Sequence, residues 1–285
     1  MNIKTKQFQI LTDINLVWNF MTDIYDPYFA NGAAAPFFEY ALTSKWMDKE
    51  YLHLNRLWMA GDIVVGFVFT EAVVTSVFFN LRPGYEGLAD EMVEYAQNSF
   101  PDLGGERELV IFSGQEALIR AAEKEGYKVS YENADFLFDF RKSGLSYDLP
   151  EGFHFVDPFK CDLLKLAKCT WNGFNAEELG PFKNWNIPDS ETPWNPHKAY
   201  TGVVNSAVAP PPHATHEYNV IIADENEDYV CFSGMWWVPE NKLAYMEPLC
   251  TVPEYRRRGL AAAALTQHYR RLKVLGAEYM TGGGD

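Results

Sequence analysis

The chain has 285 residues, of which 47% are hydrophobic and 22% charged, a composition typical of a folded globular protein. A formal net charge of −15 argues against nucleic-acid binding, since neutralising phosphates requires an excess of basic groups. The sequence contains neither an apolar run approaching the roughly 20 residues that span a bilayer nor the apolar stretch of a signal peptide, so we expect a cytoplasmic protein without a membrane partner.

Residues 1–145 predict one α/β unit, because short runs rich in β-branched and aromatic residues alternate with amphipathic stretches. In chain order, we expect a strand pair within 54–70 around a turn at Gly61-Asp62, and then a strand at 75–81. A helix follows with Leu88, Met92, Tyr95, Ala96 and Phe100 on one stripe, and then a strand at 108–112. We expect a second helix from about 115 that stops at Gly126, and strands near 127–131 and 135–140. The polar segment 141–150 is the expected linker.

Residues 150–285 predict a second unit. Its expected elements are a strand at 152–156, a helix at 160–174, a loop rich in Pro, Asn and Trp between Trp171 and His216, a hairpin of 218–223 and 229–237, a strand at 243–252, a helix at 258–275 and a short strand at 278–281. Both halves thus contain a hairpin, a further strand, a helix and a short strand. This shared order predicts two tandem copies of one mixed α/β fold, each a central sheet flanked by helices.

The segment 243–262, LAYMEPLCTVPEYRRRGLAA, contains the clearest functional signal. An apolar strand ends at Val252-Pro253, a turn with three arginines follows, and Gly259 precedes a helix that begins with small residues. A helix N-terminus directs free N–H groups and the positive end of its dipole at one point, and a glycine there lets a ligand approach the backbone. The pattern predicts a phosphate or pyrophosphate site; the alternative is a solvated basic helix face.

The charge distribution favours the phosphate interpretation. Six basic residues and no acidic one occur between Arg256 and Ala277, although the rest of the chain is strongly acidic. A local positive field on a negative protein predicts a polyanionic ligand held at one place.

Arg256-x-x-Gly259-x-Ala261 after a strand, with Val252-Pro253 before it, resembles the acetyl-CoA-binding motif Arg/Gln-x-x-Gly-x-Gly/Ala of the GNAT superfamily of N-acetyltransferases. The specific resemblance covers about residues 217–282. The first half resembles this fold only in element order, because its corresponding turn at 81–86 lacks the motif spacing. The resemblance implies two tandem GNAT folds, with a degenerate copy over 1–145 and an acetyltransferase domain over 150–285.

The resemblance also implies acetyl-CoA as cosubstrate, no metal, and direct attack of a primary amine of a small molecule or peptide on the thioester. By this likeness, the backbone of Cys250, Thr251 and Val252 would bind the pantetheine arm and the acetyl carbonyl. The pyrophosphate would be bound by the turn and the first helical residues, which are Arg256, Arg257, Arg258, Gly259, Leu260 and Ala261.

Glu247 lies on the motif strand, where many family members place a general base. Strand alternation predicts that residues 247, 249 and 251 share one face and that 246, 248, 250 and 252 share the other. A carboxylate among apolar neighbours is expected to have a raised pKa, which suits proton removal near neutrality. The alternative is a surface or ion-paired glutamate.

In the family, a further helix follows the strand that corresponds to 278–281 and commonly supplies a tyrosine that protonates the leaving thiolate. The sequence ends at Asp285, so the resemblance implies a shortened C-terminal copy, and no residue is assigned as the general acid. Two functions therefore stay open at this point, an N-acetyltransferase and a non-catalytic acyl-CoA-binding or interaction module.

The remaining motifs favour no other chemistry. Four cysteines without a CxxC pair predict reduced, buried thiols, and His213 and His216 in a Pro-rich loop are a weak pattern for a metal site. The loop tryptophans, which are Trp171, Trp185 and Trp194, either line an acceptor pocket or fix the loop to the surface.

Overall fold

The chain divides into two compact units in a computed structural model that describes residues 2–72, 74–105, 107–188 and 194–282. Met1–Leu42 and Trp46–Glu132 form the first unit, and Thr43–Lys45 with Asn133–Asp285 form the second. The division at 132/133 lies before the predicted linker at 141–150, because one strand joins the second unit instead of the first.

The first unit contains a five-stranded sheet of order β1-β2-β3-β4-β5, in which β4 and β5 are parallel and the other neighbours antiparallel. The hairpin predicted within 54–70 is confirmed as β2 and β3. The strand β1 and the helices α1 and α2 lie before residue 54 and were not predicted. The elements are β1 (Ile3–Gln7), α1 (Ile10–Asp23), α2 (Ala35–Ala41), β2 (Arg56–Ala60), β3 (Ile63–Phe69), β4 (Ser76–Leu81), α3 (Ala89–Ser99), β5 (Glu108–Val110) and α4 (Glu116–Lys124), with 3-10 turns at Lys49–Leu54 and Glu86–Leu88.

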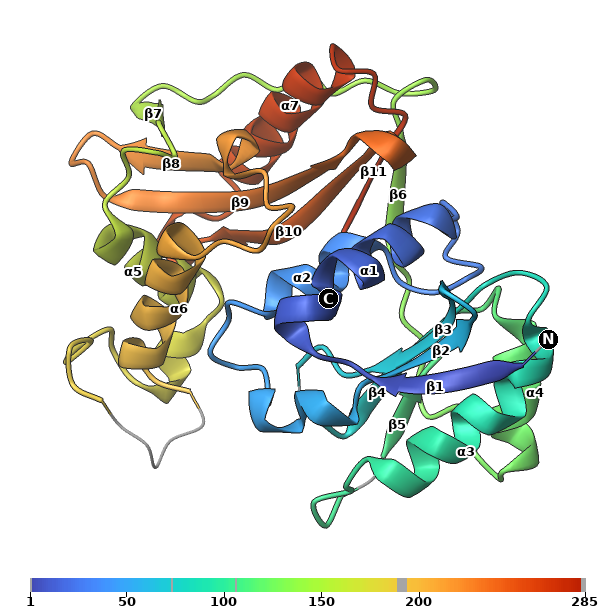
Figure 1. Cartoon of the computed structure of the whole chain (residues 1–285). Coiled ribbons are helices and arrows are strands. Elements are labelled where there is room, and N and C mark those ends of the chain that lie inside the picture. The colour runs from blue at the N-terminus through green and yellow to red at the C-terminus, as the bar shows by residue number, and fades with distance from the viewer. Residues whose placement is uncertain (1, 73, 106, 189–193, 283–285) are drawn as a thin grey trace. The chain divides into compact units, whose positions relative to one another are not determined.

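Helices cover both faces of this sheet (Figure 1). Helices α1 and α2 lie over one face, where Phe38 packs edge-on against Phe67 and Phe69. Helices α3 and α4 lie over the other face, where Met92 and Leu118 are fully buried. Burying aromatic and aliphatic surface on both faces is the main source of stability for such a layered unit.

The second unit contains a six-stranded sheet of order β6-β11-β10-β9-β8-β7. Strands β10 and β11 are parallel and the other neighbours antiparallel. The elements are β6 (Phe136–Asp139), β7 (Phe153–Val156), α5 (Leu163–Gly173), α6 (Pro196–Val208), β8 (Val220–Asp224), β9 (Tyr229–Val238), β10 (Leu243–Thr251), α7 (Leu260–Lys273) and β11 (Tyr279–Gly282), with 3-10 turns at Ala176–Leu179, His216–Tyr218, Pro239–Asn241 and Pro253–Tyr255.

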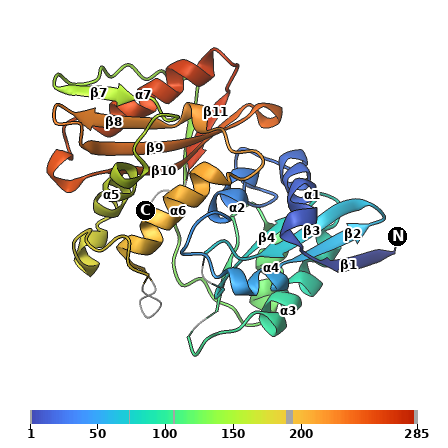
Figure 2. The same ribbon diagram turned by 60° about the vertical axis from the view of Figure 1, so that its left-hand side comes forward.

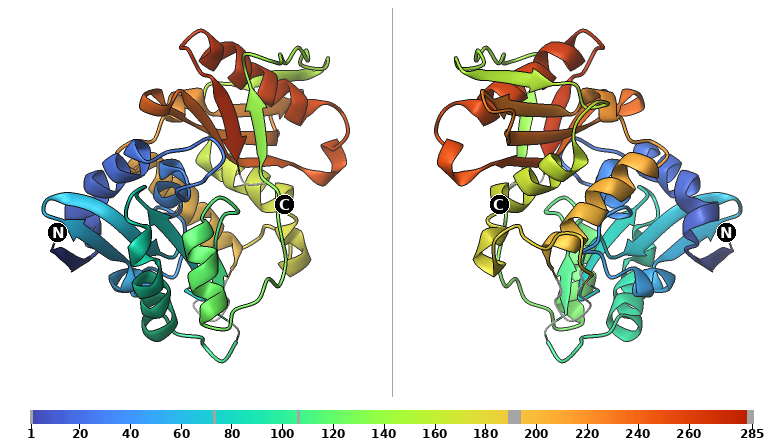
Figure 3. Two further views of the ribbon diagram at one scale, coloured as in Figure 1. Left: turned by 90° about the vertical axis from the view of Figure 1, so that its right-hand side faces the viewer. Right: turned by 90° about the vertical axis from the view of Figure 1, so that its left-hand side faces the viewer.

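Strand β6 belongs to this second sheet, so the prediction that 135–140 closes the first unit was wrong. It pairs antiparallel with β11, with Phe136 opposite Gly282 and Asp139 opposite Tyr279, and the two strands lie side by side in Figure 3. Arg141, shortly after β6, also links the two strands, because it forms ion pairs with Asp139 of β6 and with Glu278, the residue before β11. A segment from before the linker therefore adds the strand beside β11 in the C-terminal copy.

Two further predictions were wrong. Residues 127–131 form no strand, and the long segment between Trp171 and His216 contains the 13-residue helix α6. Asn195 begins that helix by accepting a hydrogen bond from the backbone N–H of Lys198, and Pro196 follows at a position where its missing N–H is not needed.

The tryptophans of that segment fix it to the second unit. Trp171 is 2% exposed, donates to the carbonyl of Gly180 and stacks on Trp194. Trp185 packs edge-on against Tyr200 of α6. Of the two roles left open for these side chains, their contacts favour attachment of the segment.

Helix α7 covers one face of the second sheet and α5 and α6 the other, as Figure 2 shows. Leu260, Ala264 and Leu272 of α7 pack on one face. Leu166 and Cys169 of α5 pack on the opposite face, against Phe232 and Cys250. These contacts assign Ala244, Met246 and Leu249 of β10 to the α7 face and Cys250 to the α5 face.

His268 of α7 is completely buried and its Nε2 lies 2.9 Å from the hydroxyl of Ser233 on β9. Burial, with a smaller contribution from the positive charge of Arg271, lowers its pKa from 6.5 to about 3. Between these two values the unfolded chain binds a proton that the folded chain does not. The stability that His268 contributes is therefore complete above pH 6.5 and is lost as the pH falls toward 3.

We expect His268→Gln to flatten this acid sensitivity. Linkage at 1.36 kcal/mol per pKa unit gives a loss of about 3 kcal/mol between pH 7 and pH 4 in the wild type, which the variant should not show. Urea unfolding at pH 7, 5 and 4 measures the difference. His154→Gln, at an exposed position in the same unit, is the control, and an identical pH dependence for wild type and His268→Gln would contradict the assignment.

Candidate functional site

Strand β10 forms one side of the site and leaves part of its edge open. In the described residues it pairs with β11 only from Leu243 to Tyr245, although β10 continues to Thr251. On its other edge, β10 follows β9 as far as Thr251 opposite Cys231. Among the described residues, no strand pairs with this edge from Glu247 to Thr251, so its backbone donors and acceptors are open to a ligand.

A bulge at Glu247 and Pro248 interrupts the pairing of β10 with β9, where both residues lie opposite Gly234. A Cβ at Gly234 would come within 2.2 Å of the carbonyl oxygen of Glu247, so only glycine allows this approach. Such a bulge adds one residue to a strand and changes which side chains face each way.

The predicted alternation along β10 holds after the bulge, where Leu249 and Thr251 share one face and Cys250 and Val252 the other, but it is wrong for Met246. Met246 and Leu249 both pack on the α7 face, and Thr251 bonds to Cys231 on that same face. Cys250 packs on the α5 face. Glu247 and Pro248 are the two bulge residues opposite Gly234.

The phosphate turn, which we define as residues 256–259, connects β10 to α7 after the 3-10 turn Pro253–Tyr255. Arg257 has φ 60° and Gly259 has φ 87°, and this left-handed pair bends the backbone into the start of α7. Within the described chain, no side chain caps that helix. Its first N–H groups and the positive end of the dipole are therefore directed at the concave side of the turn, as an anion requires.

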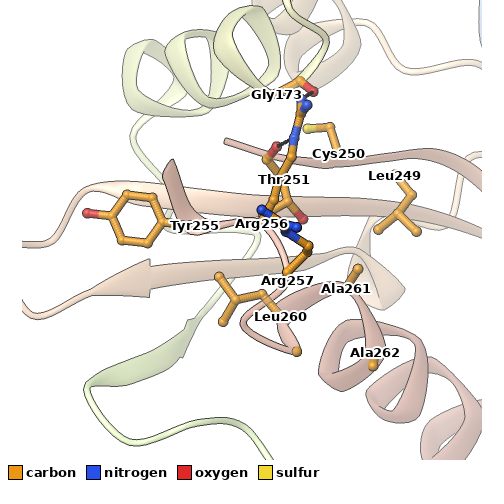
Figure 4. A pocket seen from close by; sticks show the side chains of 11 residues that line it. Gly173, Leu249, Cys250, Thr251, Tyr255, Arg256, Arg257, Leu260, Ala261 and Ala262 are labelled. Carbon is orange, nitrogen blue, oxygen red and sulfur yellow. Dashed lines mark hydrogen bonds between the residues drawn. The ribbon is translucent and has the colours of Figure 1, made fainter. Parts of the chain in front are cut away.

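A pocket of about 500 Å³ lies between this turn, β10 and the end of α5, and Figure 4 shows its lining. The lining residues are Gly173, Leu249, Cys250, Thr251, Tyr255, Arg256, Arg257, Gly259, Leu260, Ala261 and Ala262.

The structure brings together seven of the ten residues that the sequence selected. Those lining the pocket are Cys250, Thr251, Arg256, Arg257, Gly259, Leu260 and Ala261.

The other three residues have different surroundings. Val252 donates its N–H to the carbonyl of Val230, and its own carbonyl accepts from Tyr255, so both polar groups of its backbone are already used. Arg258 lies over the rings of Phe153 and Tyr255. Glu247 is half-buried on β10 outside the lining.

Sequence reasoning missed four lining residues. Leu249, Tyr255 and Ala262 lie within or beside the motif and could have been included by adjacency. Gly173 comes from the end of α5, and nothing in its local sequence indicates this contact. Its place is fixed by packing, because a Cβ there would lie 2.7 Å from Sγ of Cys250.

Tyr255 also anchors the turn to β8. Its hydroxyl donates to Asp224 at 2.7 Å, and Asp224 accepts from the backbone of Asn226 and Asp228 as well. Burial raises the pKa of Asp224, but these hydrogen bonds outweigh burial and hold the pKa below its usual range. Asp224 is therefore the charged partner that fixes Tyr255.

The basic residues of α7 do not all converge on the pocket. Arg270 pairs with Asp148 at 3.6 Å, and Arg271 donates to the carbonyl of Glu217. Lys273 donates to the hydroxyl of Tyr269. The positive charge at the pocket comes instead from the phosphate turn and the helix N-terminus.

The four cysteines are free thiols, and Cys161 is the one that is partly exposed. The described residues include no group of three His, Cys, Asp or Glu side chains placed to hold a metal ion. Nor do the helices formed by these residues include one long and apolar enough to cross a membrane.

Residues 179–281 match the sequence model of the acetyltransferase (GNAT) family. The match contains α6, β8 to β10, the phosphate turn and α7, so it includes all of the pocket except Gly173. No curated protein sequence is significantly similar to the chain.

Solved structures share the fold across both units. A GCN5-related N-acetyltransferase from Sphaerobacter thermophilus is similar with a TM-score of 0.53 and 13% identity, covering 98% of this chain and 85% of that one. A tandem GNAT protein from the clavulanic acid biosynthesis pathway, solved without AcCoA, is similar with a TM-score of 0.53 and 10% identity, covering 99% and 90%. At such identities the likeness concerns the fold alone, and it confirms the predicted fold class of two mixed sheets flanked by helices.

Proposed function

We propose that this chain, which is a tandem GNAT-fold protein, binds acetyl-CoA in the pocket of its second unit and transfers the acetyl group to a primary amine of a small molecule or peptide. The observation that carries the proposal is the N-terminus of α7, which no described side chain caps, facing a pocket that is also lined by the end of β10 from Leu249 to Thr251.

The two ends of the pocket suit the two ends of a CoA thioester. The N–H groups between Arg257 and Ala261 would bind the pyrophosphate, with the Arg257 side chain adding positive charge. From there the pantetheine arm would follow β10 past Thr251 and Cys250 toward Leu249, beside the unpaired edge. The amide groups of the pantetheine arm can hydrogen-bond to the backbone of an open strand edge, in the way that a neighbouring strand does.

The reaction needs one carbon–nitrogen bond formed and one carbon–sulfur bond broken. The amine nitrogen attacks the thioester carbonyl carbon, a backbone N–H of β10 stabilises the oxyanion, and CoA leaves as the thiolate. We assign Glu247 to removal of the amine proton. Its half-buried position at the bulge, on the strand that also provides Leu249, Cys250 and Thr251 to the pocket, supports this role.

Calorimetric titration with acetyl-CoA and with CoA tests the binding, and acetylation of a panel of primary amines followed by thiol release tests the transfer. Saturable binding of both with thiol release supports the proposal. Saturable binding without release by any amine would favour the non-catalytic acyl-CoA-binding module. An absence of binding would refute the cofactor assignment.

A further inference from the structure

Arg256 connects the phosphate turn to the end of α5. Its Nη2 donates to the carbonyl of Gly173 at 2.9 Å and to Oδ1 of Asn175 at 2.7 Å, and its Nε donates to the carbonyl of Thr251 at 3.0 Å. Figure 4 shows the side chain reaching across to Gly173. The guanidinium therefore makes contacts within the protein, and we call these contacts the Arg256 clamp.

The acceptors of this clamp are placed by α5. The last carbonyls of a helix lack partners within it and lie at the negative end of its dipole, so a cation there is favourable. Gly173, the final residue of α5, can reach this position because it has no Cβ, which would lie 2.8 Å from the Cβ of Cys250. The end of α5 and the end of β10 are thus held against each other beside the turn.

The side chain of Asn175 provides the third acceptor for the Arg256 guanidinium, besides the backbone carbonyls of Gly173 and Thr251. Its φ of 58° places it in the left-handed region, which asparagine tolerates better than most residues, and the chain reverses there into Ala176–Leu179. This reversal brings Oδ1 back to Arg256, the residue that begins the phosphate turn.

We propose that Asn175 is a positioning residue for the phosphate turn, acting through Arg256 to hold the N–H groups of Arg257 to Ala261 in their binding arrangement before a ligand arrives. The proposal rests on the proposed function, because it assigns a preorganising role to a site for CoA phosphates. A turn that is already ordered loses less entropy on binding, and therefore binds more tightly.

Three variants separate this role from a general structural one. Asn175→Gly removes the acceptor and keeps the left-handed backbone without strain, whereas Asn175→Asp keeps an acceptor oxygen. Asn184→Gly is the matched control, since Asn184 is an exposed asparagine with φ 54° in the same segment and outside the clamp. Hydrogen exchange of the amides of 257–261 and calorimetric CoA affinity are measured for each full-length protein.

We expect Asn175→Gly to accelerate exchange at 257–261 and to weaken CoA binding about tenfold, with melting temperature unchanged within a few degrees. Asn175→Asp and Asn184→Gly should resemble the wild type. Wild-type exchange at 257–261 in Asn175→Gly, or acceleration spread evenly over the second unit, would overturn the proposal. Exchange tests the clamp without any ligand, so a wild type that fails to bind CoA would refute the proposed function separately.

Discussion

The Gly259→Glu variant is expected to lose CoA binding, with the dissociation constant rising at least about 100-fold, which corresponds to about 3 kcal/mol. Two effects act together. A carboxylate would occupy the position where the helix N-terminus attracts phosphate, so attraction would be replaced by repulsion. Gly259 also has φ 87°, a conformation that side chains disfavour, and the turn would shift to relieve the strain.

Gly276→Glu is the control that separates these effects. Gly276 has φ 91°, follows the other end of α7, and has no atom within 4 Å of a built Cβ. It therefore adds the same charge and the same backbone strain outside the pocket. Calorimetric titration with CoA should show near-normal affinity for Gly276→Glu and none for Gly259→Glu. Retained binding in Gly259→Glu would rule out the phosphate turn as the CoA site.

The motif region could be predicted from sequence because its determinants are local. The strand, the turn with Gly259 and the start of α7 are encoded within about twenty adjacent residues, in the order that an anion site at a helix N-terminus requires. Local periodicity also predicted the hairpins in both units. Seven of ten selected residues line the pocket for the same reason.

The features that sequence could not predict depend on contacts between distant segments. Phe136 pairs with Gly282, and no local pattern tells which sheet a short strand will join. One extra residue at the bulge of β10 puts Met246 on the same face as Leu249, and that bulge depends on Gly234 in another strand. The contacts of Arg256 with Gly173 and Asn175 likewise arise from packing.

Substitution of Glu247 by glutamine is expected to lower kcat about 100-fold with the amine that the wild type acetylates best, and to leave CoA affinity unchanged. General base catalysis contributes about 10²–10⁴-fold in comparable reactions, and glutamine has nearly the same shape without the capacity to accept the amine proton. Because Glu247 lies outside the pocket lining, we expect its replacement to leave the CoA-binding residues unchanged. Steady-state kinetics with acetyl-CoA and calorimetry with CoA measure the two quantities.

The pH dependence distinguishes proton removal from a structural role of Glu247. Raising the pH deprotonates the amine in solution, so the base is needed less and the deficit of Glu247→Gln should shrink as the pH approaches the amine pKa. Glu240→Gln, in the exposed turn Pro239–Asn241 that precedes β10, removes the same charge and should retain wild-type turnover. A deficit that stays constant with pH and comes with weaker CoA binding would mean that Glu247 supports the bulge. Unchanged turnover would exclude Glu247 as the base.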